Sequence, residues 1–211
     1  MYEYQDDVFF YLTLMNENYA HPDMPMGVEE DIIRGLYRFQ KTAKPSKKHV
    51  NLMGSGTILV QAIKAAEMLK EDFGVTSDIW SATSFNELGR DCQDAARWNR
   101  MNPLEEPRVP FVAQQLKGAK GPFIAATDYM KAFAEQIRPC VPGRYTVLGT
   151  DGFGRSDSRV NLRRFFEVDA NHIAAAAMVD LFREGAVTKA QVQKALKLYD
   201  IDGEKPNPRL V

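Results

Sequence analysis

The residues best suited to chemistry gather in one stretch, Gly149 to Arg159, which reads GTDGFGRSDSR. Two aspartates, two serines and two arginines within a few positions could in principle bind an anion or share protons. No histidine lies near Ser156 in the sequence, so a Ser–His–Asp hydrolase is disfavoured. Arg155 and Arg159 could instead pair with the aspartates and lock the loop.

The surroundings of this stretch predict where it lies in the fold. The short apolar run Tyr145–Leu148 precedes it, and helical spacing begins near Val160. Glycine-rich segments suit tight strand-to-helix crossovers, which lie at the carboxyl edge of an α/β sheet, where ligands and partners bind. We therefore predict that the loop orders an interface or the mouth of an active site, through five residues: Asp151, Arg155, Ser156, Asp157 and Arg159.

Other polar features have a structural interpretation beside the functional one. The turn Gly54–Thr57 could cradle an anion on its backbone N–H groups, but it lacks a P-loop lysine and a third glycine, which favours a plain turn. The three histidines, His21, His49 and His172, do not have the spacing of metal ligands. His172 is beside an alanine-rich helix and is expected to pack there.

The elements around these residues alternate between strand and helix. Strands are predicted over 49–54, 78–82, 122–126 and 145–148, and helices over 58–73, 84–97, 128–137, 169–183 and 188–199. Ser84 with Glu87 has the pattern of a helix N-cap, and Asp128 is predicted to cap the following helix. The alternation predicts an α/β fold with three αβα layers and a mostly parallel sheet of about five strands.

The first residues have a different character. Val8–Leu14 is a continuous apolar run typical of a strand buried on both faces, yet no neighbouring strand follows it. Residues 29–39 suit a short helix or an extended connector, and Lys41–Lys48 is polar and loop-like. We therefore predict that residues 1–45 are the end of a preceding domain plus a linker, and that residues 46–211 form the compact domain.

Composition excludes several classes of protein. The chain has 211 residues, of which 45% are hydrophobic, and its net charge of -1 gives no electrostatic reason for a nucleic-acid or anionic-membrane partner. No apolar run approaches the length of a membrane span, and the acidic N-terminus does not resemble a signal peptide. Cys92 and Cys140 are far apart, so reduced thiols in the cytoplasm are expected.

Several long motifs resemble one family closely. They are NENY at 16–19, NLMGSGTIL at 51–59, SDIWSATSFNELGRD at 77–91, ATDYMKAFAEQIR at 126–138, GTDGFGRSDSR followed by NLRRFFEVDA, and the tail DIDGEKPNPRLV. Together they resemble the homodimeric bacterial pyruvate dehydrogenase decarboxylating component, over its C-terminal region alone. The resemblance implies a transketolase C-terminal-like domain, with Val8–Leu14 as the last strand of a preceding pyrimidine-binding domain.

The resemblance also implies cofactors and partners. The full-length enzyme uses thiamine diphosphate and Mg²⁺, decarboxylates pyruvate, and reductively acetylates a lipoyl group on an acetyltransferase component. Its Mg²⁺ motif opens with Gly-Asp-Gly, which this chain lacks, so neither cofactor is expected to bind here and the chain alone is expected to be inactive. By the same placement, Asn16, Glu17, Asn18 and Tyr19 would lie near the active-site mouth of the full-length enzyme.

Two interpretations remain open at this point. The chain is the dimerising and domain-packing part of that enzyme, or it is a non-catalytic association module or small-ligand-binding α/β domain that uses the turn at Gly54.

Overall fold

The computed structural model describes residues 2–9, 15 and 17–211. Within them, five strands form one sheet in the order β1-β3-β2-β4-β5: β1 (Leu36–Gln40), β2 (His49–Gly54), β3 (Thr76–Ala82), β4 (Phe123–Ala126) and β5 (Tyr145–Leu148). Strands β2 to β5 run parallel, whereas β1 pairs antiparallel with β3 at the edge. The predicted α/β class and the mostly parallel five-stranded sheet are confirmed.

Alternation along the central strands builds a separate core on each face of the sheet. In β2, Val50 and Leu52 enter one core, while Met53 enters the other. The first core is closed by α2 (Ile58–Phe73), α6 (Arg159–Phe165), α7 (Ala170–Arg183) and α8 (Lys189–Leu198). The second is closed by α3 (Phe85–Met101), α4 (Phe111–Gln115) and α5 (Lys131–Glu135).

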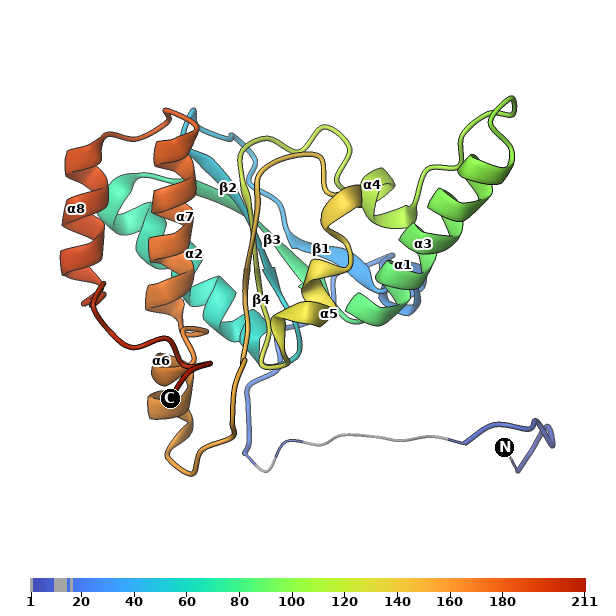
Figure 1. Cartoon of the computed structure of the whole chain (residues 1–211), viewed down its shortest axis with the longest axis horizontal. Helices are drawn as coiled ribbons and strands as arrows, with labels where there is room; N and C mark the ends of the chain where they lie inside the picture. Colours follow the sequence, from blue (N-terminus) through green and yellow to red (C-terminus); the bar gives the residue numbers. More distant parts are fainter. Residues whose placement is uncertain (1, 10–14, 16) are drawn as a thin grey trace.

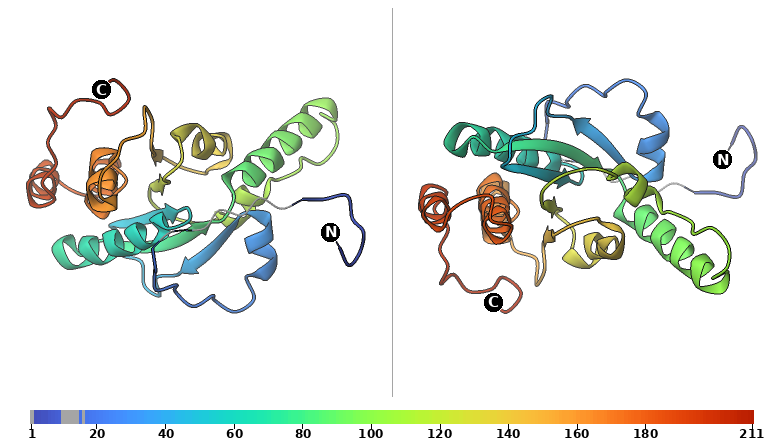
Figure 2. Two further views of the ribbon diagram at one scale, coloured as in Figure 1. Left: turned by 90° about the horizontal axis from the view of Figure 1, so that it is seen from below. Right: turned by 90° about the horizontal axis from the view of Figure 1, so that it is seen from above.

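The helices therefore form two layers with the sheet between them, as Figure 1 shows. Helices α2, α7 and α8 lie on one side of the strands, and α3, α4 and α5 on the other. Helices α7 and α8 lie side by side in both views of Figure 2. This is the predicted αβα arrangement. Loops cover the two sides of the sheet at which the parallel strands begin and end; we call these the amino edge and the carboxyl edge.

Most helix starts follow their local sequence signals. Ser84 caps α3, its hydroxyl accepting from the Glu87 N–H at 3.1 Å, as predicted. Asp128, in contrast, does not cap the next helix: α5 is only five residues long, and Met130 holds its N-cap position. The N–H of Lys131 donates instead to the Asp151 carboxylate at 2.9 Å. A side chain from a distant loop thus replaces the predicted local cap.

Part of the predicted linker belongs to the sheet. Helix α1 (Glu29–Arg34) ends at Gly35, and β1 follows at once, with Leu36 fully buried. Of residues 29–39, predicted as a short helix or an extended connector, the first part forms the helix α1, and the rest is corrected to a strand, because β1 pairs with β3 far along the chain. The division into domains at residue 45 otherwise stays a prediction. Of the predicted strand Val8–Leu14, Val8 and Phe9 are exposed coil, and residues 10–14 lie outside the described residues.

The two cysteines differ from expectation. Cys92 on α3 and Cys140 at the end of the short 3₁₀ turn η1 (Arg138–Cys140) are joined in a disulfide, with their Cα atoms 6.5 Å apart. They are 48 residues apart in sequence, so their spacing could not reveal the pairing. Only the packing of α3 against the α5 region brings them together.

In the described part of the chain, every helix is too short or too polar to cross a bilayer.

Candidate functional site

The carboxyl ends of β2, β3, β4 and β5 meet at one edge of the sheet, because these strands run parallel. The loops that leave this edge include the predicted turn at Gly54 and the predicted loop 149–159. Ligands of open α/β sheets commonly bind at this edge, so the predicted site residues can be judged by what they contact here.

Asp151 holds the predicted loop against its neighbour. Its carboxylate accepts the Lys131 N–H, and the adjacent Thr150 N–H donates to the Tyr129 carbonyl at 2.9 Å. Gly152 has φ of +102°, and a Cβ there would lie 2.6 Å from the Pro208 carbonyl oxygen, so the C-terminal tail requires glycine at this position. Asp151 therefore serves as a structural clamp, and its carboxylate is already engaged.

The second half of the loop forms hydrogen bonds with the first residues of α6. The Asp157 carboxylate accepts from the Ser158 N–H at 2.6 Å and from the Asn161 side-chain amide at 2.8 Å. The bond from the Asn161 side chain, followed by the Ser158 backbone bond, lowers the pKa of Asp157. The Arg155 guanidinium stacks 4.0 Å over the Phe165 ring, and Ser156 is exposed. Asp157 and Arg155 thus hold the loop through these contacts, and among the described residues Arg155 forms no ion pair with Asp151 or Asp157.

Arg159 connects the loop to the N-terminal segment. Its Nε lies 2.9 Å from Glu17 Oε1, and the Tyr19 hydroxyl donates to Glu17 Oε2 at 2.8 Å. The hydrogen bond from Tyr19 is the main cause of a lowered pKa of Glu17, and the bond and charge of Arg159 lower it further. Asn18 is exposed, and Asn16 lies outside the described residues. Two predicted groups of residues, 142 positions apart in the chain, therefore meet through Glu17 and Arg159.

Arg163 completes the cluster and was not predicted. Its guanidinium donates to the Tyr19 hydroxyl at 3.1 Å and reaches Thr57 Oγ1 at 3.5 Å. Arg163 follows Arg159 by one helical turn on α6, so both project from one face of that helix. This i, i+4 spacing from Arg159 is the sequence signal from which Arg163 could have been predicted. We call Glu17, Tyr19, Thr57, Asp128, Arg159 and Arg163 the carboxyl-edge cluster.

A small cavity lies inside this cluster. It measures about 170 Å³ and is lined by Asp128, Thr150, Arg159, Leu162, Arg163, Phe166 and Val168. Burial raises the pKa of the Asp128 carboxyl, against the opposing charges of Arg163 and Arg159. The volume of this cavity is below the 300–1,000 Å³ typical of pockets for drug-sized ligands. The cluster therefore fills its own part of this edge and leaves only a small cavity there.

A divalent cation does not fit this arrangement. Asp128 has two guanidinium groups as its charged neighbours, and Asp151 is already engaged by a backbone N–H. Mg²⁺ needs several oxygen ligands in near-octahedral order. Across the described residues, no three histidine, cysteine, aspartate or glutamate side chains gather closely enough to hold a metal ion.

The turn at Gly54 is required by packing. A Cβ at Gly54 would lie 2.4 Å from Leu59 Cα, so only glycine allows α2 to start so close to the end of β2. Of the histidines, His172 packs against the Asp169 side chain, with Nδ1 at 2.6 Å from its carboxylate. Anion binding at the Gly54 turn stays the less favoured alternative.

Comparison with known proteins settles the family. The model of the transketolase-like C-terminal domain matches residues 35–169, which is more than half of the chain. The chain belongs to this family. Its match begins at Gly35, directly before β1, in agreement with the place of that strand in the sheet.

The chain is also similar in sequence to individual curated proteins. The chain is 55% identical over its whole length to the pyruvate dehydrogenase E1 component of Cupriavidus necator, and 53% identical over 99% of its length to that of Escherichia coli K12. It is homologous to the C-terminal part of this component. The chain spans only about a quarter of the length of these relatives, 24% and 23% respectively.

A solved structure supports the fold. Transketolase from Leishmania mexicana superposes with a TM-score of 0.50 at 15% sequence identity, over 75% of this chain and 20% of the transketolase chain. At this identity the likeness concerns the fold alone.

Proposed function

We propose that the chain is the C-terminal domain of a thiamine-diphosphate-dependent pyruvate dehydrogenase E1 component. The observation that carries this proposal is the 55% identity over the entire chain to an E1 component of which it covers 24%. In the full-length enzyme, pyruvate loses CO₂ and the remaining two-carbon unit reductively acetylates a lipoyl group. This domain contributes packing and dimerisation, not reacting groups.

The residues present support the division of labour. Thiamine diphosphate requires Mg²⁺ to bridge its diphosphate to protein oxygens, and the carboxyl-edge cluster presents two arginines against two carboxylates, of which Glu17 is already paired with Arg159. The described residues do not fit the cofactor, and no catalytic step is assigned to them. The cofactor site of the proposed enzyme belongs to its other domains.

The surface that meets those domains is proposed to be the carboxyl edge. Phe153 at the tip of the loop is 85% exposed, and Ser156 and Asn18 beside the cluster are also exposed. An exposed aromatic ring on an ordered loop is suited to burial against another domain or subunit. We propose that this edge contacts the preceding domain or the second subunit of a homodimer, near the route of the lipoyl group of the acetyltransferase component.

A cytoplasmic location is part of the proposal, and the disulfide makes it testable. Disulfides are uncommon in a reducing compartment. The structure holds Cys92 and Cys140 as a disulfide, which a reducing cytoplasm would keep open as two thiols, so we expect both residues to be alkylated when cells are lysed in the presence of an alkylating agent. Mass spectrometry that finds both residues unalkylated and bonded in fresh lysate would contradict the location.

The central test is a decarboxylation assay. The 211-residue chain, supplied with pyruvate, thiamine diphosphate and Mg²⁺, is expected to release no CO₂. Turnover by the chain alone would show that it holds the catalytic groups and would overturn the proposed division.

The interface is tested in the full-length subunit. Arg155→Ala removes the guanidinium that stacks on Phe165 and should loosen the loop. We expect a weaker dimer or slower lipoyl acetylation, while Arg97→Ala, an exposed arginine on α3, should change neither. If dimerisation, thiamine diphosphate affinity and acetylation are all unchanged in Arg155→Ala, the loop is not at the interface.

A further inference from the structure

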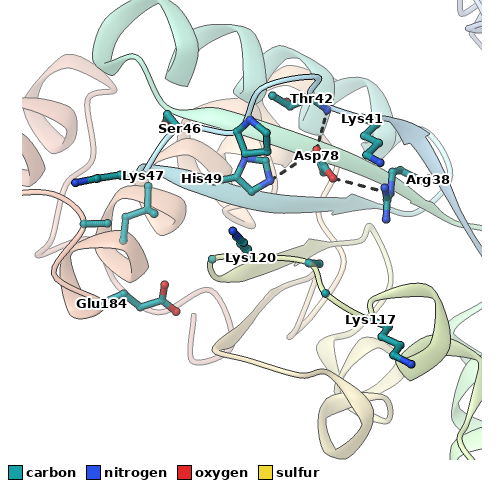
Figure 3. A pocket seen from close by; sticks show the side chains of 16 residues that line it. Arg38, Lys41, Thr42, Ser46, Lys47, His49, Asp78, Lys117, Lys120 and Glu184 are labelled. Atoms are coloured by element: carbon teal, nitrogen blue, oxygen red, sulfur yellow. Dashed lines mark hydrogen bonds and ion pairs between the residues drawn. The ribbon is translucent and has the colours of Figure 1, made fainter.

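The opposite edge of the sheet, where the parallel strands begin, holds a larger hollow. We call it the amino-edge pocket; its volume is about 620 Å³, within the range of sites for small molecules. It lies between the end of β1, the start of β2, the loop before β4 and the end of α7, as Figure 3 shows. No sequence motif pointed to it, because its walls come from four separate parts of the chain.

The walls of this pocket are strongly cationic. Five positive side chains line it, against two carboxylates: Arg38, Lys41, Lys47, Lys117 and Lys120, with Asp78 and Glu184. The whole chain carries a net charge of -1, so this surplus is local. A concave surface of one sign concentrates oppositely charged ligands more strongly than a flat one.

At the floor of the pocket, only Arg38 among these cations lies close to a carboxylate, that of Asp78. Asp78, which is 7% exposed, accepts the Thr42 N–H at 2.8 Å and lies 3.9 Å from Arg38 Nε. The Arg38 guanidinium also stacks 4.4 Å over Trp80, which fixes its plane. Arg38 and Asp78 therefore compensate each other inside the protein.

The lysines are not compensated in this way. Within the described residues, Lys41, Lys47, Lys117 and Lys120 form no ion pair with any carboxylate. In Figure 3 Lys120 and His49 point into the hollow, whereas Lys117 and Lys47 point away from it, and Lys41 lies on the side opposite Lys47. The positive charge at this edge is available to a ligand.

The loop 117–121, KGAKG, adds neutral donors. Over the described residues, the backbone N–H groups of Gly118, Lys120 and Gly121 donate no hydrogen bond. Gly118 and Gly121 both have positive φ, +77° and +78°. Backbone N–H groups in such tight turns are common ligands of phosphate oxygens.

His49 provides a buried polar base to the pocket. Its ring is 5% exposed, with Nδ1 at 2.8 Å from Thr76 Oγ1 and Nε2 at 3.7 Å from Asp78 Oδ1. Burial lowers the pKa of His49 despite the opposing charge of Asp78. The imidazole adds no further charge at neutral pH.

One side of the pocket is apolar. Leu181 and Ala186 on the α7 side and Pro45 on the β1–β2 connection complete the lining. A hollow with lysines on one part and aliphatic surface on another suits a ligand with a charged and an uncharged portion. Inorganic ions alone would leave this apolar surface unused.

From these observations we propose that the amino-edge pocket binds a phosphate-bearing small molecule, with its phosphate on Lys120 and the KGAKG loop and with Lys41 and Lys47 adding positive charge from opposite sides. This site is independent of the proposed E1 function, because it lies at the edge remote from the carboxyl-edge cluster.

Pyrophosphate is the probe for the test, measured by isothermal titration calorimetry on the 211-residue chain at low salt. We expect saturable binding that Lys47→Ala/Lys120→Ala weakens at least 10-fold. The control Lys64→Ala/Lys197→Ala removes the same charge from exposed positions on α2 and α8 and should weaken it less than 2-fold. Citrate, a carboxylate polyanion, should bind at least 10-fold more weakly than pyrophosphate.

A second measurement locates the ligand without any substitution. Pyrophosphate should shift the NMR signals of the His49 ring, and of no other histidine ring, at the same concentrations that produce the calorimetric signal. Absence of saturable binding, equal losses in both double variants, equal binding of citrate, or an unmoved His49 signal would each overturn the proposal.

Discussion

The two edges of one sheet treat their charges in opposite ways. At the carboxyl edge, Arg159 pairs with Glu17, and Arg163 donates to Tyr19, so the chain satisfies its own cations. At the amino edge, Lys47 and Lys120 line a hollow about 620 Å³ in volume with no described carboxylate within pairing distance. The sequence motifs are concentrated at the first edge, but the open cationic pocket is at the second.

This difference teaches that a conspicuous motif does not mark an open binding site. The residues of loop 149–159 are distinctive because many of them are needed to fold it: Asp151 clamps the start of α5, and Asp157 bonds Ser158 and Asn161 at the start of α6. Residues used for ordering are less available for a ligand. Among the described residues, the side chains of Lys41 and Lys47 in the polar linker form no such bond.

The largest expected effect is a loss of stability at the amino edge, in the loop that forms one wall of the pocket. In Gly121→Ala, the new Cβ would lie 1.9 Å from the His49 carbonyl oxygen, at a φ of +78°. We expect a loss of about 4 kcal/mol in the free energy of unfolding, from steric overlap added to backbone strain. Gly118→Ala shares the positive φ but meets nothing within 4 Å, and should lose about 1 kcal/mol. Urea denaturation measures both, and equal losses would contradict the close approach.

A second change breaks the link between the sheet and the pocket wall. Asn51 accepts from the Trp80 indole N–H at 3.1 Å and donates to the Lys120 carbonyl at 2.8 Å. Asn51→Ala leaves both groups unpaired and should cost about 2–3 kcal/mol in urea denaturation. Asn86→Ala, at an exposed position, should cost under about 0.5 kcal/mol. A loss in Asn51→Ala no larger than in this control would show that the bridge is absent.

The pH dependence follows from the buried ring at the amino edge. The pKa of His49 is lowered by burial from its ordinary 6.5, so below pH 6.5 the unfolded chain takes up a proton that the folded chain does not. His49 therefore destabilises the fold as the pH falls through 6.5 toward its folded pKa. Between pH 7.5 and 5.5, His49→Gln should show a smaller loss of unfolding free energy than the wild type. An identical loss would contradict the burial of a neutral ring.

The smallest effect concerns the carboxyl edge. The pKa of Glu17 is lowered first by the Tyr19 hydroxyl and then by Arg159. In an NMR titration, Tyr19→Phe should raise the pKa of Glu17 toward 4.5, and Arg159→Gln should raise it by a smaller amount. Neither change should move the unfolding midpoint measurably, since the pair is exposed to solvent. An unchanged pKa in both variants would show that the N-terminal segment does not dock here.

Local signals predicted much of the fold. The helix over 58–73 and the strands over 49–54 and 145–148 agree with the structure residue by residue, because their periodicity and flanking glycines are local properties. The cap of α5 was mistaken because Asp151, and not Asp128, supplies it from another loop. The strand β1 was mistaken for a connector because its partner β3 lies some forty residues away.

The sequence by itself determined the class of fold, the family and the identity of the conspicuous loop, since these depend on periodicity and on long motifs. Tertiary structure decided which charges meet. It joined Glu17 to Arg159 and Cys92 to Cys140, and it gathered the lysines of the amino-edge pocket from separate loops. The physical reason is that Coulomb and hydrogen-bond interactions depend on distance in space, which the order of residues along the chain does not give.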